Sequence, residues 1–97
     1  NLAGFYKEEG EIEKAIAHYK RAIRISKEFH GKEHPYVVDN LARLAKIYSN
    51  LGRFEDAGVY LAELSDIVIE AFGDNHIRTA RMERTIAYYY RKKKEID

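Results

Sequence analysis

Two histidines, His30 and His34, stand four residues apart in the stretch FHGKEHP, with Glu33 between them. On a continuous helix this spacing would place both imidazoles on one face, as in a zinc-binding pair. Gly31 and Pro35 instead favour the end of one helix and the first turn of the next. The chain has no cysteine, and no nearby histidine completes a ligand set. We therefore predict a turn, with His34 as a turn or capping residue, and no metal or other cofactor.

Other kinds of catalytic site are not recognisable in the sequence. Ser26, Ser49 and Ser65 stand in helix-forming segments without a paired base, and no glycine-rich phosphate loop is present, so we expect no enzyme activity. No apolar run approaches the roughly 20 residues needed to span a membrane, and no signal peptide is visible. Because the absence of cysteine also permits a reducing compartment, we expect a cytoplasmic location.

The turn motif recurs at a fixed distance, which indicates an internal repeat. Gly73 lies 42 residues after Gly31, and His76 lies 42 residues after His34. Sliding the sequence over itself by this step gives ten identities, which pair Leu2 with Leu44, Ala3 with Ala45, Tyr6 with Tyr48, Gly10 with Gly52, Glu13 with Glu55, Ala15 with Ala57, Ile25 with Ile67, Glu28 with Glu70, Gly31 with Gly73 and His34 with His76. A step of this length is typical of a repeat array, in which each unit packs on the next.

Helix-period patterns fill the segments between the glycines, and no strand-like alternation interrupts them. We predict an all-α chain with five helices, over residues 1–9, 12–30, 35–51, 54–72 and 76–94. Asp74 or Asn75 can cap the last of these helices, and His76, like His34, is expected as a turn or capping residue. Short joints at Gly10 and Gly52 permit antiparallel helix pairs. Each pair leaves an apolar face that the next pair covers, so the chain should form one α–α superhelix.

The spacing Leu-Ala-x-x-Tyr-x-x-x-Gly-x-Ile/Phe-x-x-Ala begins at Leu2 and again at Leu44. It resembles the tetratricopeptide repeat, and with the motif Gly-x-x-His-Pro it is similar to the 42-residue variant of kinesin light chains. The resemblance implies a helical-hairpin solenoid with one repeat over residues 1–34, a second over 35–76 and a partial third over 77–97, as a fragment of a longer array. HEAT and armadillo repeats have similar periods but do not account for the glycine joints followed by alanine five residues on.

In the family that the chain resembles, the first helix of each repeat lines a concave groove that holds a peptide or a partner helix. By register, the resemblance implies groove positions at Lys7, Asp39, Arg43, Lys46, Asn50, Arg81, Arg84, Tyr88 and Arg91, with Gly4, Glu8, Ala42, Ser49, Thr85 and Lys92 beside them. Seven of these positions are basic and two are acidic, whereas a solvated helix face usually mixes both signs. We therefore predict a protein–protein interaction scaffold that binds an acidic segment, with a plain solvated surface as the alternative.

Charge is distributed unevenly along the chain. Residues 1–76 hold ten Lys or Arg against thirteen Asp or Glu, a balance of −3, whereas residues 77–97 hold seven against three, a balance of +4. The positive charge of the last helix leaves nucleic-acid binding open as an alternative function. A further alternative is a purely structural repeat segment that binds no partner. The overall charge of +1 makes nucleic acid the less favoured partner.

Three consecutive tyrosines in the last helix cannot all face one core, because successive helical residues point about 100° apart. We expect Tyr90 inside, at the repeat position of Tyr48, and Tyr88 in the groove. Tyr89, with Met82 and Ile86, is expected on an open apolar face without a partner helix. A face of this kind tends to be covered, so we predict self-association through these three residues.

Overall fold

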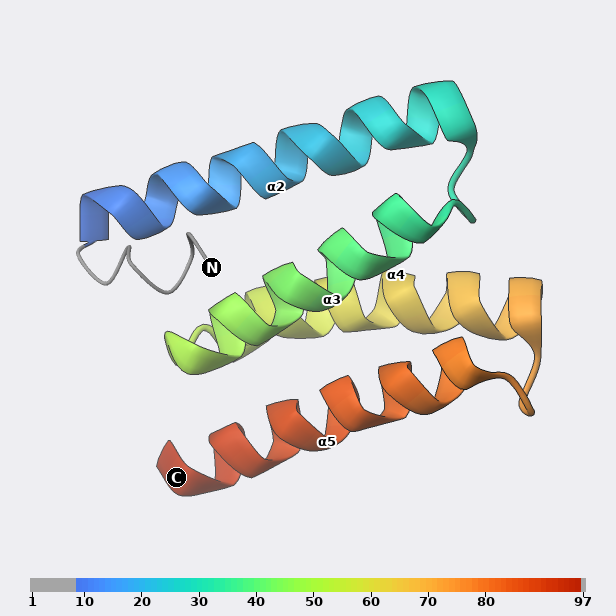
Figure 1. The fold of residues 1–97 in the computed structure, drawn as a ribbon. Helices are drawn as coiled ribbons and strands as arrows, with labels where there is room; N and C mark the ends of the chain where they lie inside the picture. The colour runs from blue at the N-terminus through green and yellow to red at the C-terminus, as the bar shows by residue number, and fades with distance from the viewer. Residues whose placement is uncertain (1–8, 97) are drawn as a thin grey trace.

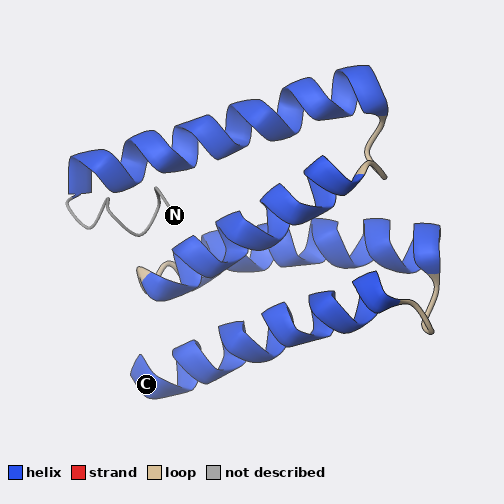
Figure 2. Cartoon of the chain, viewed as in Figure 1, coloured by secondary structure: helices blue, strands red, loops and turns tan. Residues whose placement is uncertain are grey.

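The computed structural model describes residues 9–96, and these form four helices joined by short turns (Figures 1 and 2). The helices are α2 (Glu9–His30), α3 (Pro35–Asn50), α4 (Phe54–Phe72) and α5 (Ile77–Ile96). Residues 9–96 contain no strand, so the predicted all-α fold is confirmed. The helix expected over residues 1–9 lies outside the described residues, apart from its last position. None of α2 to α5 is both long and apolar enough to cross a membrane.

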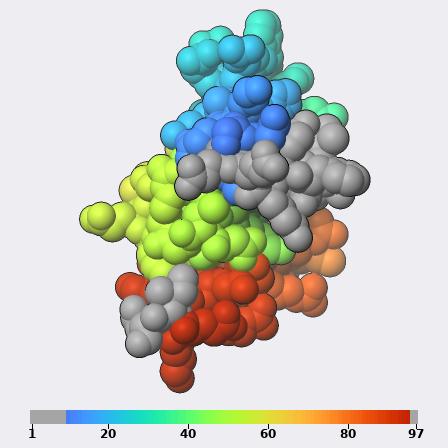
Figure 3. Space-filling view, turned by 90° about the vertical axis from the view of Figure 1, so that its left-hand side faces the viewer, coloured from blue at the N-terminus to red at the C-terminus, as the bar shows by residue number. Residues whose placement is uncertain are grey.

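The four helices pack as successive antiparallel hairpins. α3 and α4 form the most extensive helix pair, α2 packs on α3, and α5 packs on both α3 and α4. In the space-filling view α2 (blue) and α5 (red) lie on opposite sides of the pair formed by α3 and α4 (Figure 3). Each hairpin therefore covers apolar surface of its neighbour, as a helical-hairpin solenoid requires.

Helix α3 supplies the centre of the core. Val37, Leu41, Leu44 and Ala45 have no exposed surface. Their spacing of four, three and one residues places them along one side of the helix, which α2, α4 and α5 enclose. Tyr48 continues this side, and its ring stacks on that of Tyr60 in α4, with the centroids 5.7 Å apart.

The other three helices complete one contiguous core around α3. Residues buried in it are Ile16 and Ile23 from α2, Ala57, Leu61, Leu64, Ile67 and Val68 from α4, and Met82 from α5. The buried residues of α4 recur at the spacing of one helix face, in agreement with the helix-period pattern predicted for this segment. Burial of such side chains is worth about 1.5–3 kcal/mol each and stabilises the array against the entropy of the unfolded chain.

The apolar residues of α5 lie differently from the prediction. Tyr90 was expected inside but is 62% exposed, whereas Met82 was expected on an open face and is 6% exposed. Ile86 and Tyr89 are half-buried against the core, and the Tyr89 ring meets the edge of Phe54 in α4 at 5.8 Å. The three residues proposed for self-association thus cover α4 and do not form an open apolar face. Self-association itself stays a prediction, without this surface to support it.

A pair of substitutions on α5 measures this difference in burial. Met82→Ala should lower the free energy of unfolding by about 2–5 kcal/mol, because it removes buried atoms and leaves a cavity. Tyr90→Ala should lower it by less than about 1 kcal/mol, because the ring is largely solvated. Urea unfolding followed by circular dichroism measures both changes. Similar losses for the two variants would contradict the position of Met82 in the core.

A second prediction concerns Gly58, which lies inside α4, where glycine costs about 1 kcal/mol relative to alanine. A Cβ at this position would lie 3.8 Å from the Tyr89 hydroxyl oxygen, an ordinary contact distance. Gly58→Ala should therefore raise the free energy of unfolding by about 0.5–1 kcal/mol. Gly31→Ala is the matched control and should destabilise, because the φ of Gly31 is 89°. If Gly58→Ala lowered the free energy of unfolding instead, the Tyr89 hydroxyl of α5 would have to lie closer to Gly58 than the structure places it.

Candidate functional site

The histidine turn between α2 and α3 is built around a helix cap. Gly31 has a φ of 89°, and its amide donates to the Lys27 carbonyl at 3.1 Å, which ends α2. His34 then precedes Pro35, the first residue of α3, and its Nδ1 accepts the amide N–H of Tyr36 at 3.2 Å. The predicted turn and the predicted capping role of His34 are both confirmed.

The turn between α4 and α5 repeats this construction. Gly73 has a φ of 75°, and the Nδ1 of His76 accepts the amide N–H of Arg78 at 3.1 Å. Of the residues predicted to cap α5, His76 and not Asp74 or Asn75 therefore supplies the cap. Imidazole does so at both turns because its Nδ1 reaches the amide two residues further on, as a shorter Asn or Asp side chain does in other helices.

Ring stacking accompanies each of these caps. The imidazole of His34 stacks on that of His30 with centroids 4.3 Å apart, and the ring of His76 stacks on Phe72 at 4.6 Å. Stacked imidazoles hold their in-plane lone pairs nearly parallel, so His30 and His34 do not converge on a common point. Within residues 9–96, no three His, Cys, Asp or Glu side chains gather as a metal-binding group. The HGKEH stretch is thus a structural turn in this fold.

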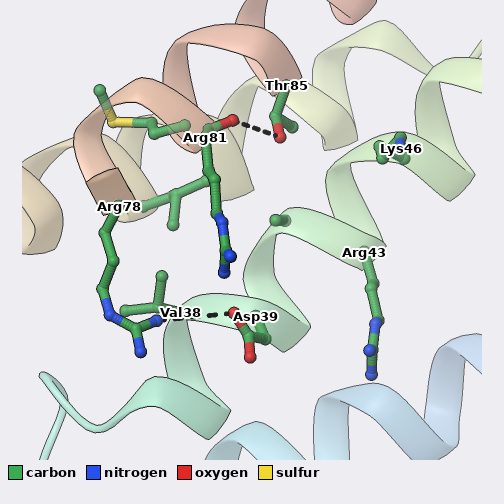
Figure 4. A pocket seen from close by; sticks show the side chains of 10 residues that line it. Val38, Asp39, Arg43, Lys46, Arg78, Arg81 and Thr85 are labelled. Carbon is green, nitrogen blue, oxygen red and sulfur yellow. Dashed lines mark hydrogen bonds and ion pairs between the residues drawn. The ribbon is translucent and has the colours of Figure 1, made fainter.

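A charged surface lies between α3 and α5, which run side by side (Figure 1). Its first part is a cavity of about 320 Å³ whose polar side chains come from both helices (Figure 4). The residues that line it are Val38, Asp39, Ala42, Arg43, Lys46, Leu64, Arg78, Arg81, Met82 and Thr85. Val38, Leu64 and Met82 belong to the core or its edge, so the cavity combines an apolar base with a charged rim.

A second cavity, of about 450 Å³, continues from the first and shares Lys46 and Thr85 with it. Its other lining residues are Arg84, Ala87, Tyr88 and Arg91. Most of the residues of α3 and α5 predicted for the groove therefore lie along one surface, which we call the α3–α5 groove. Ser49, predicted beside them, is instead buried, and its hydroxyl donates to the Ala45 carbonyl. Asn50 joins it through its side-chain oxygen, which accepts a hydrogen bond from the Tyr88 hydroxyl. Lys7, the remaining predicted residue, lies outside the described residues, as do Gly4 and Glu8.

Ion pairing leaves most of the groove cations without an acidic neighbour. Asp39 forms an ion pair with Arg78, with 3.8 Å between their charged atoms. In the part of the chain that the structure describes, no carboxylate lies within ion-pair distance of five cations, which are Arg43, Lys46, Arg81, Arg84 and Arg91. Arg78 was not among the residues predicted for the groove. It lies three residues before Arg81, and that spacing, which places it on the same helix face, was the available signal.

Tyr88 gathers several of these cations around its ring. The Lys46 Nζ lies 5.2 Å from the ring centroid, the Arg91 Cζ 5.3 Å and the Lys92 Nζ 5.7 Å. Attraction between a cation and an aromatic face holds such groups in place. Lys92 also pairs with Glu95 at 3.6 Å, one turn further along α5. The predicted position of Tyr88 in the groove agrees with this arrangement.

A second group of cations links the repeats away from the groove. Arg53, in the turn after α3, forms ion pairs with Glu13 of α2 and Asp56 of α4, and its guanidinium lies over the Tyr48 ring. Burial acts to lower the pKa of Arg53, but these two carboxylates outweigh it and the pKa is raised. Lys20 lies on the same ring, and its interaction with the Tyr48 hydroxyl raises the pKa of Lys20. This group is a structural link between hairpins, because its charges neutralise one another.

Fold and groove together define a helical-hairpin repeat protein. Models of the tetratricopeptide repeat match residues 1–57 and residues 41–78. The chain belongs to the tetratricopeptide repeat family, whose members are generally non-enzymatic protein–protein interaction modules. The 42-residue kinesin-light-chain variant remains a prediction.

Relatives of the chain carry the same repeat. Human "Tetratricopeptide repeat protein 19, mitochondrial" is 35% identical over 49 residues, which cover 50% of this chain and 13% of that protein. The rat and mouse proteins of the same name are each 30% identical over 60 residues, or 62% of this chain and 16% of theirs. The chain thus spans less than a fifth of these relatives, and no solved structure matches it. Their names say mitochondrial, and the cytoplasmic location expected for this chain remains a prediction.

The histidine caps generate a stability prediction. His34→Ala should lower the free energy of unfolding by about 0.5–2 kcal/mol, because the Tyr36 amide loses its acceptor. His34→Asn should restore most of this loss, since an Asn side chain accepts the same bond. His18→Ala, on the exposed surface of α2, is the control and should have little effect. If His34→Asn were as unstable as His34→Ala in urea unfolding, ring stacking on His30 and not the cap would be the source of the stability.

Proposed function

We propose that the α3–α5 groove binds a segment of a partner protein that carries acidic side chains and one apolar or aromatic anchor. The observation that carries this proposal is the group of five groove cations with no carboxylate within ion-pair distance among residues 10–95, whose side chains the structure describes. A surface that only needed solvation would gain from interspersed charges of both signs. Here the acidic complement is left for a partner to supply.

The shape of the groove supports a chain segment as its ligand. Its two cavities share Lys46 and Thr85, so together they form an elongated surface along α3 and α5. Guanidinium groups bind carboxylates through two parallel hydrogen bonds, which suits the arginines of the rim. Met82, Val38 and Leu64 line the first cavity and offer an apolar contact for the anchor side chain.

Energetics set the expected strength of this interaction. An exposed ion pair contributes at most about 1 kcal/mol, so several must form together for measurable binding. Affinity should therefore be modest and should fall as salt screens the charges. We place the chain in this role as an interaction segment of a longer protein, because it spans less than a fifth of its relatives.

Arg84→Glu tests this proposal. The change should weaken binding of a labelled peptide with a run of Asp and one Trp by about ten-fold, because an attraction becomes a repulsion. Fluorescence anisotropy at low and high salt measures the binding, and circular dichroism should show an unchanged fold because Arg84 is exposed. Arg21→Glu makes the same change in charge on the exposed surface of α2 and serves as the control.

Three results would argue against the groove. If Arg84→Glu bound the peptide as well as the unmodified chain, the contact would lie elsewhere. Failure of the unmodified chain to bind any acidic peptide would favour a purely structural repeat segment. Stronger binding of a single-stranded oligonucleotide than of the peptide would favour nucleic acid as the partner.

A further inference from the structure

The second cavity of the groove, around Tyr88, has a chemistry more specific than attraction to acidic residues. We propose that it is a binding site for a phosphorylated serine or threonine side chain in the partner segment, which it prefers to a carboxylate. This inference rests on the proposed function, because it names the group that the partner presents to the same groove. It concerns four lining residues, which are Lys46, Arg84, Tyr88 and Arg91.

Helix geometry brings three of these residues onto one face. Arg84, Tyr88 and Arg91 are spaced by four and three residues on α5, and therefore share one side over two turns. The two arginines are about 10 Å apart along the axis, a distance that two long side chains reaching inward can span. Lys46 comes from α3, on the opposite wall of the same cavity. An anion between the helices can therefore contact cations from both.

Positive charge is concentrated at this point before any ligand binds. Lys46 and Arg91 both lie against the Tyr88 ring, at 5.2 and 5.3 Å from its centroid, and Lys92 lies at 5.7 Å. Glu95 neutralises Lys92, but no carboxylate of residues 10–95 is paired with Lys46 or Arg91. Like charges held close together repel, and an anion with more charge relieves more of this repulsion.

Phosphate suits such a site better than a carboxylate does. A phosphorylated side chain carries about −1.5 to −2 charges and three acceptor oxygens, whereas a carboxylate carries one charge on two oxygens. Guanidinium forks bind phosphate oxygens in pairs, and lysine adds a point charge. Phosphate can therefore engage Arg84, Arg91 and Lys46 through different oxygens, whereas a carboxylate has only two oxygens to share among three cations.

The neighbouring cavity favours a phosphorylated protein segment over a free phosphate ion. This is the first cavity of the groove, which adjoins the second cavity around Tyr88 and has Val38, Leu64 and Met82 in its lining. These apolar side chains contribute nothing to binding an isolated ion. For a peptide they provide a contact for a side chain that flanks the phosphorylated residue, and this contact adds affinity that inorganic phosphate lacks.

Degenerate peptide pools test this inference without knowledge of the partner. Three labelled nonapeptide pools would differ only at the central residue, which is serine, aspartate or phosphoserine. Fluorescence anisotropy with the whole chain should give binding of the phosphoserine pool about ten-fold tighter than the aspartate pool, with little binding of the serine pool. Inorganic phosphate as a competitor should displace the phosphoserine pool only at much higher concentration than the unlabelled phosphoserine pool does.

Matched variants locate the site. Arg91→Gln and Lys46→Gln should each reduce the affinity for the phosphoserine pool about five-fold or more, and Arg91→Lys should recover only part of this because it keeps the charge but loses the fork. Arg21→Gln removes a charge from the exposed surface of α2 and should leave binding unchanged. Circular dichroism checks that every variant is folded.

Each of the remaining outcomes would contradict a different part of the inference. Equal binding of the phosphoserine and aspartate pools would overturn the phosphate preference and leave the acidic-segment proposal standing. Binding of neither pool would overturn the phosphate site, and the Asp-rich peptide of the preceding subsection then decides separately whether the acidic-segment proposal stands. Phosphoserine binding that survives Arg91→Gln and Lys46→Gln, or displacement by inorganic phosphate as efficient as by the peptide, would overturn the assignment to this cavity.

Discussion

Enclosure of α3 by three other helices is the constraint on which the rest of this structure depends. Val37, Leu41 and Leu44 have no exposed surface because α2, α4 and α5 cover them from different directions. Only one side of α3 is left, and it carries Asp39, Arg43 and Lys46, spaced by four and three residues. The groove is therefore a consequence of the core: once the apolar side is buried, the charged side must face the space beside α5.

The two histidine turns determine how α3 and α5 meet. Each turn has a glycine with positive φ, a histidine that caps the following helix and a ring stacked on that histidine. Equal turns 42 residues apart lead into helices with similar directions, so α3 and α5 lie side by side and not crossed. A motif that first suggests metal chemistry thus positions the α3–α5 groove, because capping and stacking together fix the start of each helix.

The sequence was sufficient for the fold because its local signals agree with one another. Helix ends at Gly31 and Gly73, helix starts near Pro35 and Phe54, and the apolar stripes all follow from backbone and periodicity rules. The residues of α5 whose burial was predicted wrongly show what backbone and periodicity rules leave undetermined. Tyr90 has the repeat position of Tyr48, but Tyr48 is buried because α4 covers it through Tyr60, whereas in residues 9–96 no helix follows α5 to cover Tyr90. Burial depends on neighbours far along the chain, and a repeat register does not specify them.

The groove was predictable as a face but not as an electrostatic site. The repeat register placed Arg81, Arg84 and Arg91 together, whereas the pairing of Asp39 with Arg78 required knowledge of how α5 lies beside α3. The same holds for Tyr88, whose ring partly offsets the repulsion between Lys46 and Arg91 by lying against both. This compensation is incomplete, because a neutral ring attracts each cation by only about 0.5–1 kcal/mol at an exposed site. An anion placed among these cations would replace weak attraction to a ring with charge-assisted hydrogen bonds, so the free chain already holds the geometry that a negatively charged partner would stabilise.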